Sequence, residues 1–327
     1  MRLKNVAKLD IQYLDGSVRL PHSSRPYTES DIAAWRAEHL QDWSASARLR
    51  TAAAQVYAVK KPEWFRSAER SARRFVRGLG LEGCRGAQVT LVDIHSTEQA
   101  ASVFSYESDD ISPDAETNYF NGTVVRLDRI SALRDVSKLA VGSLLVHELT
   151  HAAEWLNPVI YLGNADKNGE LLIRASRMGH TVITDSIPQG LFFAEGIAEF
   201  NAGLYVRKQQ DRNSPLISIA GRPSIELPDH YFQNPARDFH VSGRDGYSIE
   251  LLAWGVENKQ ITSSENFINT TYASYSPNPS ERLRGFRGFA TYVDSIRRGL
   301  YTDLRALSYG QEDWEQGYQM VHEAVIA

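Results

Sequence analysis

The chain has 327 residues, of which 42% are hydrophobic and 23% charged, and it contains a single cysteine. These values are typical of a folded globular protein, and they exclude a disordered chain and a scaffold built on intrachain disulfides or a cysteine-based zinc cage. Residues 1–90 carry a net charge of +7 and the remainder −11. Because no nucleic-acid-binding signature accompanies the basic part, we interpret it as a solvated surface and expect no nucleic-acid partner.

The N-terminal stretch MRLKNVAKLDIQYLDG mixes charged and apolar residues, whereas a secretory signal has an unbroken apolar segment. The apolar run at residues 139–146 is also much shorter than the roughly 20 residues that cross a bilayer. We therefore expect a cytoplasmic protein with no membrane partner. Unconventional secretion, or a chain trimmed at its start, would give the same sequence and stays open.

Residues 1–85 are predicted to form a helical N-terminal region. Residues 27–59 are rich in helix formers, lack glycine and proline, and follow a capping box that begins at Thr28. A second helix is expected from Pro62, because proline fits a first helical turn, and Gly78 and Gly80 favour its end.

Residues 86–210 are predicted to form the catalytic core, which contains a small sheet. The β-branched and apolar runs at 87–94 and 122–130 predict strands, with a short helix between them. Residues 134–155 return to helical spacing. A β-ribbon is expected at 158–185, followed by a helix at 191–209.

Residues 211–327 are predicted to form a mainly helical C-terminal region. Residues 212–245 have an irregular pattern, and helices are expected at 247–259, 285–299 and 314–326. The chain as a whole is therefore predicted to have an α+β fold in which helical regions flank a core with a small sheet.

Residues 147–151 read HELTH, which places His147 and His151 one turn apart on one helix face. A single Zn²⁺ ion can bind both imidazoles, and it favours a carboxylate as third ligand with the fourth position open to water. Glu148 is then the expected general base for that water. The motif arises by chance in about one or two of a hundred chains of this length, so a third ligand is needed to support it.

The best candidate for that ligand is Glu195, in the segment FAEGIAE. We predict that Glu195 binds zinc and that Glu199, one helical turn later, hydrogen-bonds a ligating imidazole and orients it. Paired glutamates more commonly form a solvated helix face. Bulky apolar neighbours instead indicate a buried setting, where unpaired carboxylates are costly: Leu191, Phe192, Phe193, Ile197 and Phe200.

The combination of HELTH and AEGIAE resembles the gluzincins, zinc metallopeptidases whose third ligand is a glutamate. The resemblance implies a zincin-like core, a Zn²⁺ cofactor, and hydrolysis of a peptide or protein substrate. It also implies that the strand before the motif helix pairs with substrate. Residues 122–130 are the candidate, although an ordinary sheet strand is equally compatible. The aminopeptidase signature Gly-x-Met-Glu-Asn is absent from the sequence, so an endopeptidase is expected.

Gluzincins often use a tyrosine or histidine to hold the developing oxyanion. By this resemblance Tyr247, at the start of an expected helix, is the first candidate, followed by His180, His230 and His240.

Two other functions stay open. A zincin-like protein can bind zinc and act as a binding module without turnover, but the presence of Glu148, which is no ligand, argues against this. The long gap between His151 and Glu195 is close to that of anthrax lethal factor, so an effector peptidase with one specific protein substrate is also compatible.

Overall fold

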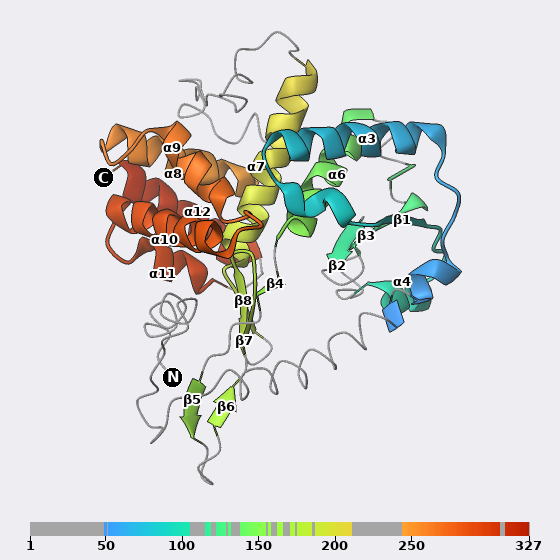
Figure 1. Ribbon diagram of the computed structural model, residues 1–327, viewed down its shortest axis with the longest axis horizontal. Helices are drawn as coiled ribbons and strands as arrows, with labels where there is room; N and C mark the ends of the chain where they lie inside the picture. The colour runs from blue at the N-terminus through green and yellow to red at the C-terminus, as the bar shows by residue number, and fades with distance from the viewer. Residues whose placement is uncertain are drawn as a thin grey trace. The chain divides into compact units, whose positions relative to one another are not determined.

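The protein has a helix-rich α+β fold with a small mixed sheet, in agreement with the expected class (Figure 1). The computed structural model describes residues 49–50, 52–104, 115–118, 122–128, 130–131, 138–154, 156–157, 162–165, 171–173, 175–184, 187–210, 244–307 and 311–326. The predicted capping box at Thr28 and most of the first expected helix lie outside the described residues, as does most of the segment 212–245.

The chain divides into two compact units that interleave along the sequence. One unit comprises residues 1–40, 155–196 and 247–327, and the other comprises residues 41–154 and 197–246. The boundary at residues 196 and 197 falls inside α7 (Leu191–Gln210), a continuous helix of 20 residues. The sequence pattern instead predicts three consecutive regions, with boundaries after residues 85 and 210. This division stays a prediction.

Helix α3 (Glu63–Gly78) begins directly after Pro62, as the sequence predicts. Its apolar face is buried and packs against α6 (Lys138–Ala152), while its exposed face carries arginines. Arg66 and Arg70 each lie 2.7 Å from a carboxylate oxygen of Glu63. The charge of this arginine face is therefore partly neutralised within the helix, which agrees with its interpretation as a solvated surface.

The sheet has the strand order β1-β3-β2. Strand β3 (Gly122–Arg126) pairs in parallel with β1 (Val89–Val92) and antiparallel with β2 (Ala115–Asn118). Of the two alternatives for residues 122–130, the ordinary sheet strand is therefore confirmed and the substrate-pairing strand is wrong. The strand ends at Arg126, and its backbone is paired on both sides, so a substrate has no free edge there. Among the described strands, β2 is the edge nearest the motif helix α6, which it contacts.

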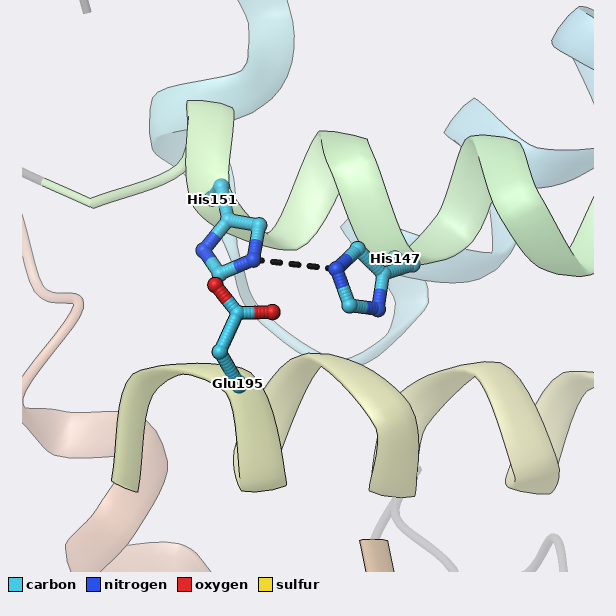
Figure 2. Close-up of side chains that lie close together, drawn as sticks. All are labelled: His147, His151 and Glu195. Carbon is cyan, nitrogen blue, oxygen red and sulfur yellow. Dashed lines mark hydrogen bonds between the residues drawn. The ribbon is translucent and has the colours of Figure 1, made fainter. Parts of the chain in front are cut away.

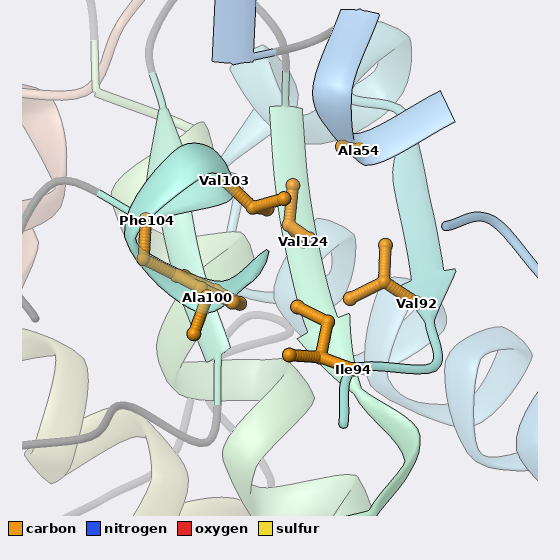
Figure 3. Packing of buried hydrophobic residues seen from close by; sticks show 7 residues of the cluster. All are labelled: Ala54, Val92, Ile94, Ala100, Val103, Phe104 and Val124. Atoms are coloured by element: carbon orange, nitrogen blue, oxygen red, sulfur yellow. The ribbon is translucent and has the colours of Figure 1, made fainter. Parts of the chain in front are cut away.

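One face of this sheet is covered by α4 (Thr97–Val103), whose N-terminus is capped by the Ser96 hydroxyl. Buried side chains from α4, from the sheet and from the preceding helical segment form a continuous apolar cluster, shown in Figure 3: Ala54, Val92, Ile94, Ala100, Val103, Phe104 and Val124. The short 3-10 helix η2 (Glu82–Gly86) contacts α6. A side chain at Gly83 would collide with the Ala153 carbonyl, so glycine permits this close approach.

Antiparallel strands lie between the motif helix and α7, as the predicted β-ribbon requires. Strands β5 (Leu162–Ala165) and β6 (Leu171–Ile173) form one antiparallel pair. A second antiparallel sheet has the order β4-β7-β8-β9, with β4 at Leu156–Asn157, β7 at Ala175–Met178, β8 at Thr181–Thr184 and β9 at Ile187–Gln189. A single residue separates the end of this sheet from the start of α7.

The C-terminal part is helical, as predicted. It contains α8 (Arg244–Asn258), α9 (Ser264–Ala273), α10 (Pro279–Ile296), α11 (Leu300–Arg305) and α12 (Gln311–Ile326). Helix α10 begins six residues before the expected start at residue 285, because the Asn278 side chain caps it by accepting from two backbone N–H groups. Among the described residues, no helix combines the length and the hydrophobicity that crossing a bilayer requires.

Candidate metal centre

Helices α6 and α7 run antiparallel, and their contacts follow one another turn by turn. Near the start of α6, a Cβ atom at Gly142 would lie 2.5 Å from the Tyr205 hydroxyl oxygen, so glycine allows the tyrosine ring to rest on the helix. Further along α6, His147 Nδ1 lies 2.9 Å from Glu199 Oε1. From one contact to the next, the residue number increases on α6 and decreases on α7. One helical turn beyond His147 and Glu199, the residues that face each other are His151 and Glu195.

The predicted ligands come together at this position. One possible ligand atom from each of His147, His151 and Glu195 lies within 4.8 Å of the other two. Figure 2 shows the three side chains close together between α6 and α7. Two imidazole nitrogens and one carboxylate oxygen form the donor set of a catalytic zinc site. The structure therefore brings together the three residues that the sequence singled out from two separate segments.

Each histidine has a carboxylate beside its Nδ1 atom. For His147 this carboxylate is Glu199, the residue predicted to orient an imidazole. For His151 it is Glu154, whose Oε1 atom lies at 3.2 Å and whose side chain is fully buried. The His151 pair is a hydrogen bond, whereas the His147 pair has the distance of an ion pair but not the geometry of a hydrogen bond. A carboxylate beside Nδ1 stabilises a proton on that atom, so both contacts favour the tautomer with the proton on Nδ1.

This tautomer leaves a lone pair on each Nε2 atom, and the two Nε2 atoms face each other 3.1 Å apart. Two lone pairs at this distance repel unless a positive charge lies between them. Around a tetrahedral ion with bonds of about 2.1 Å, two ligand atoms stand roughly 3.4 Å apart. The observed separation of the Nε2 atoms is close to this value, and the donor set fits zinc.

Glu148 follows the first histidine on α6 and is buried. Its Oε2 atom accepts a hydrogen bond of 2.6 Å from the hydroxyl of Thr117 on strand β2. The predicted general base is therefore held between the motif helix and the edge strand of the sheet.

Four of the five apolar neighbours of the two glutamates on α7 are buried, as the sequence indicates, whereas Leu191, Glu195 and Glu199 are partly exposed. Phe193 and Ile197 have no exposed surface. A partly exposed carboxylate in an apolar surround suits a site that binds a metal and still admits water or substrate.

Of the four candidates for an oxyanion-stabilising group, the structure describes the side chain of His180 alone. Tyr247 lies in the first turn of α8, but its side chain lies outside the described residues, as do His230 and His240. His180 is buried, and its Nε2 atom lies 2.9 Å from Ser274 Oγ. His180 also packs among aromatic rings, so it is a structural histidine in a core. No oxyanion group is therefore assigned.

No family profile, curated protein or solved structure matches this chain.

Sequence reasoning missed two residues of the centre. Glu154 follows His151 by three positions, and this spacing on a helix could have revealed it as a partner of the second histidine. Thr117 lies in the short strand AETN, which lacks the β-branched and apolar pattern of a strand. Its closeness to Glu148 follows from the pairing of β2 with β3, which no local pattern indicates.

Proposed function

We propose that the protein is a zinc-dependent peptidase of the gluzincin kind, with a zincin-like core made of the three-stranded sheet, α6 and α7. One observation carries the proposal. The Nε2 atoms of His147 and His151 face each other at 3.1 Å, while their Nδ1 atoms face carboxylates. The Nε2 lone pairs of the two histidines are then both available to one metal ion, and Glu195 lies near enough to bind the same ion.

In this proposal His147, His151 and Glu195 hold the ion, and Glu199 and Glu154 keep both imidazoles in the ligating tautomer. A zinc ion at this point supplies Lewis acidity, which polarises a peptide carbonyl and lowers the pKa of a water molecule.

Glu148 takes the proton from the attacking water and delivers it to the nitrogen of the leaving amine. Its position next to His147 on α6 supports this role, because the carboxylate then lies beside the metal ligands. The hydrogen bond from Thr117 occupies Oε2 and leaves Oε1 to accept the proton.

The substrate is an extended peptide that adds to the sheet at β2. This strand contacts α6, carries Thr117 and is the outer strand of the described sheet on the α6 side. Pairing along a strand edge binds the backbone of a peptide at several residues on both sides of the scissile bond, which favours an endopeptidase.

The test uses the full-length protein, refolded or purified with zinc, on casein and on a mixed peptide library. We expect about one zinc ion per chain by mass spectrometry. Glu148→Gln should keep the ion and lower the cleavage rate by at least about a thousandfold. A wild-type protein that binds no zinc contradicts the proposal, as does a Glu148→Gln variant that still cleaves. A zinc-loaded wild-type protein that cleaves nothing favours the binding module.

A further inference from the structure

The hydroxyl of Thr117 lies where β2, β3 and α6 meet. Its Oγ1 atom is 2.6 Å from Glu148 Oε2, 2.9 Å from the Glu148 carbonyl oxygen and 3.0 Å from Thr123 Oγ1. Thr117 and Thr123 are directly paired across β2 and β3, so the register of the sheet fixes both hydroxyls. A side chain in the sheet thus contacts the same glutamate through its carboxylate and its backbone.

The direction of these hydrogen bonds follows from the available protons. The Thr117 hydroxyl has one proton, and a carboxylate is the strongest acceptor within reach. The distance of 2.6 Å is typical of a hydroxyl that donates to a charged oxygen. Thr123 is fully buried, and its own hydroxyl then donates to Thr117 Oγ1. The result is a chain of two hydrogen bonds that runs from Thr123 through Thr117 to Glu148.

We infer that Thr117 is a positioning residue that fixes the orientation of the Glu148 carboxylate, with Thr123 as its support. The inference rests on the proposed function for the role of Glu148 as a base. A glutamate side chain has three rotatable bonds, and burial alone leaves several orientations of its carboxylate open. The donor on β2 selects one of them, because the strand is held by the sheet and the glutamate by its helix.

The kinetic test compares four variants of the full-length zinc-loaded protein on the peptide library. Thr117→Val keeps the shape of the side chain but removes the donor. We expect kcat to fall about 10- to 100-fold while KM stays within about twofold, because binding is retained and the base is misplaced.

The other variants serve as matched comparisons. Thr117→Ser retains a hydroxyl and should recover most of the lost kcat, and Thr123→Val should cause a smaller loss than Thr117→Val. Thr271→Val removes a similarly buried hydroxyl from α9, where Oγ1 donates to the Phe267 carbonyl. Its kcat should equal that of the wild type.

Two measurements do not depend on cleavage. The visible spectrum of the cobalt-substituted protein should be the same in Thr117→Val and in the wild type, because the metal ligands are unchanged. In a double-mutant cycle, Thr117→Val should lower the urea midpoint more in the wild-type background than in the Glu148→Ala background.

The possible results separate this inference from the proposed function. Equal midpoint losses in the two backgrounds, or an unchanged kcat in Thr117→Val, overturn the inference and leave an active zinc peptidase intact. If the cycle shows coupling but the zinc-loaded wild type cleaves nothing, the orientation of Glu148 by Thr117 stands and the proposed function fails.

Discussion

Among the described residues, His151 on helix α6 and His180 in the turn after β7 are both buried, and their surroundings differ. On α6, His147 and His151 each have a carboxylate beside Nδ1. His180 instead lies among aromatic rings, with the Phe286 and Phe289 ring centroids 5.0 and 4.8 Å away, and its Nε2 atom is 2.9 Å from a serine hydroxyl. Burial does not distinguish the two environments, since His151 and His180 are both buried.

Under the proposed function, this difference separates the proposed metal ligands from a histidine of the core. A carboxylate beside Nδ1 fixes the N–H there and leaves a basic lone pair on Nε2, which is the form that binds a metal. At His180, by contrast, the ring contacts a serine hydroxyl and aromatic side chains, which suit an imidazole packed in a core. Histidines can therefore be sorted by their polar neighbours, whereas exposure alone does not separate them.

The largest expected effect is the loss of metal after a change on α6. His151→Ala should reduce zinc from about one ion per chain to below roughly a tenth, because two ligands hold zinc far less tightly than three. The measurement is metal content after dialysis, together with the rise in melting temperature on adding zinc. His180→Asn should keep its zinc and lose about 1–3 kcal/mol of stability. Loss of zinc in the His180 variant would break the comparison.

The next effect concerns the carboxylates beside the imidazoles. Glu199→Gln and Glu154→Gln should each raise the zinc dissociation constant about 10- to 100-fold, because a weaker acceptor no longer holds the imidazole tautomer as firmly. Competition with a chromophoric chelator measures this change. Glu323→Gln on α12, where the carboxylate accepts from Gln319, is a suitable control and should bind zinc like the wild type. Unchanged affinity in both site variants would show that these carboxylates do not tune the ligands.

A smaller effect tests the packing around His180. Gly190 has a φ of +80°, and a Cβ there would lie 2.3 Å from the His180 carbonyl oxygen. Gly190→Ala should therefore lower the free energy of unfolding by about 1–3 kcal/mol, measured in urea. Gly78→Ala at the end of α3 meets no atom within 4 Å and should be neutral or stabilising. Equal effects of the two substitutions would contradict the proposed strain at residue 190.

The smallest effect concerns Cys84, in the short helix η2 that contacts α6. Burial raises the pKa of its thiol above the usual value, more than the nearby arginines lower it. At a given pH less thiolate is present, so reaction with a disulfide reagent at pH 8 should be at least about tenfold slower than in urea-unfolded protein. Because the pKa is raised, the rate should continue to rise with pH beyond the range in which an ordinary cysteine reaches its plateau. A native thiol that reacts as fast as the unfolded one would show that η2 opens readily.

Local patterns were sufficient for most of the helices and for the three residues of the candidate metal centre. Helix α3 begins after Pro62 and α6 and α7 carry their motifs at the expected positions, because capping and apolar spacing act over a few residues. His147, His151 and Glu195 could be named because each lies in a short segment with chemical meaning of its own.

The arrangement of the sheet could not be predicted in the same way. Strand β3 has the apolar sequence of a strand, but nothing in it distinguishes a central strand from an edge. Strand β2 has a polar sequence, and its place depends on pairing with β3 through contacts that are set by tertiary structure. The role of Thr117 depends on that pairing, so it became visible only in the assembled fold.

Gly142 allows helices α6 and α7 to approach each other closely. The Tyr205 ring rests on this glycine, so the size of one residue sets the distance between the two helices. The proposed metal ligands His147 and His151 lie five and nine residues further along α6, about 7.5 and 13.5 Å away at 1.5 Å per residue. A larger side chain at position 142 would collide with the Tyr205 ring and push the two helices apart. In the proposed zinc site, the spacing of the ligands would then depend on a residue that does not touch the ion.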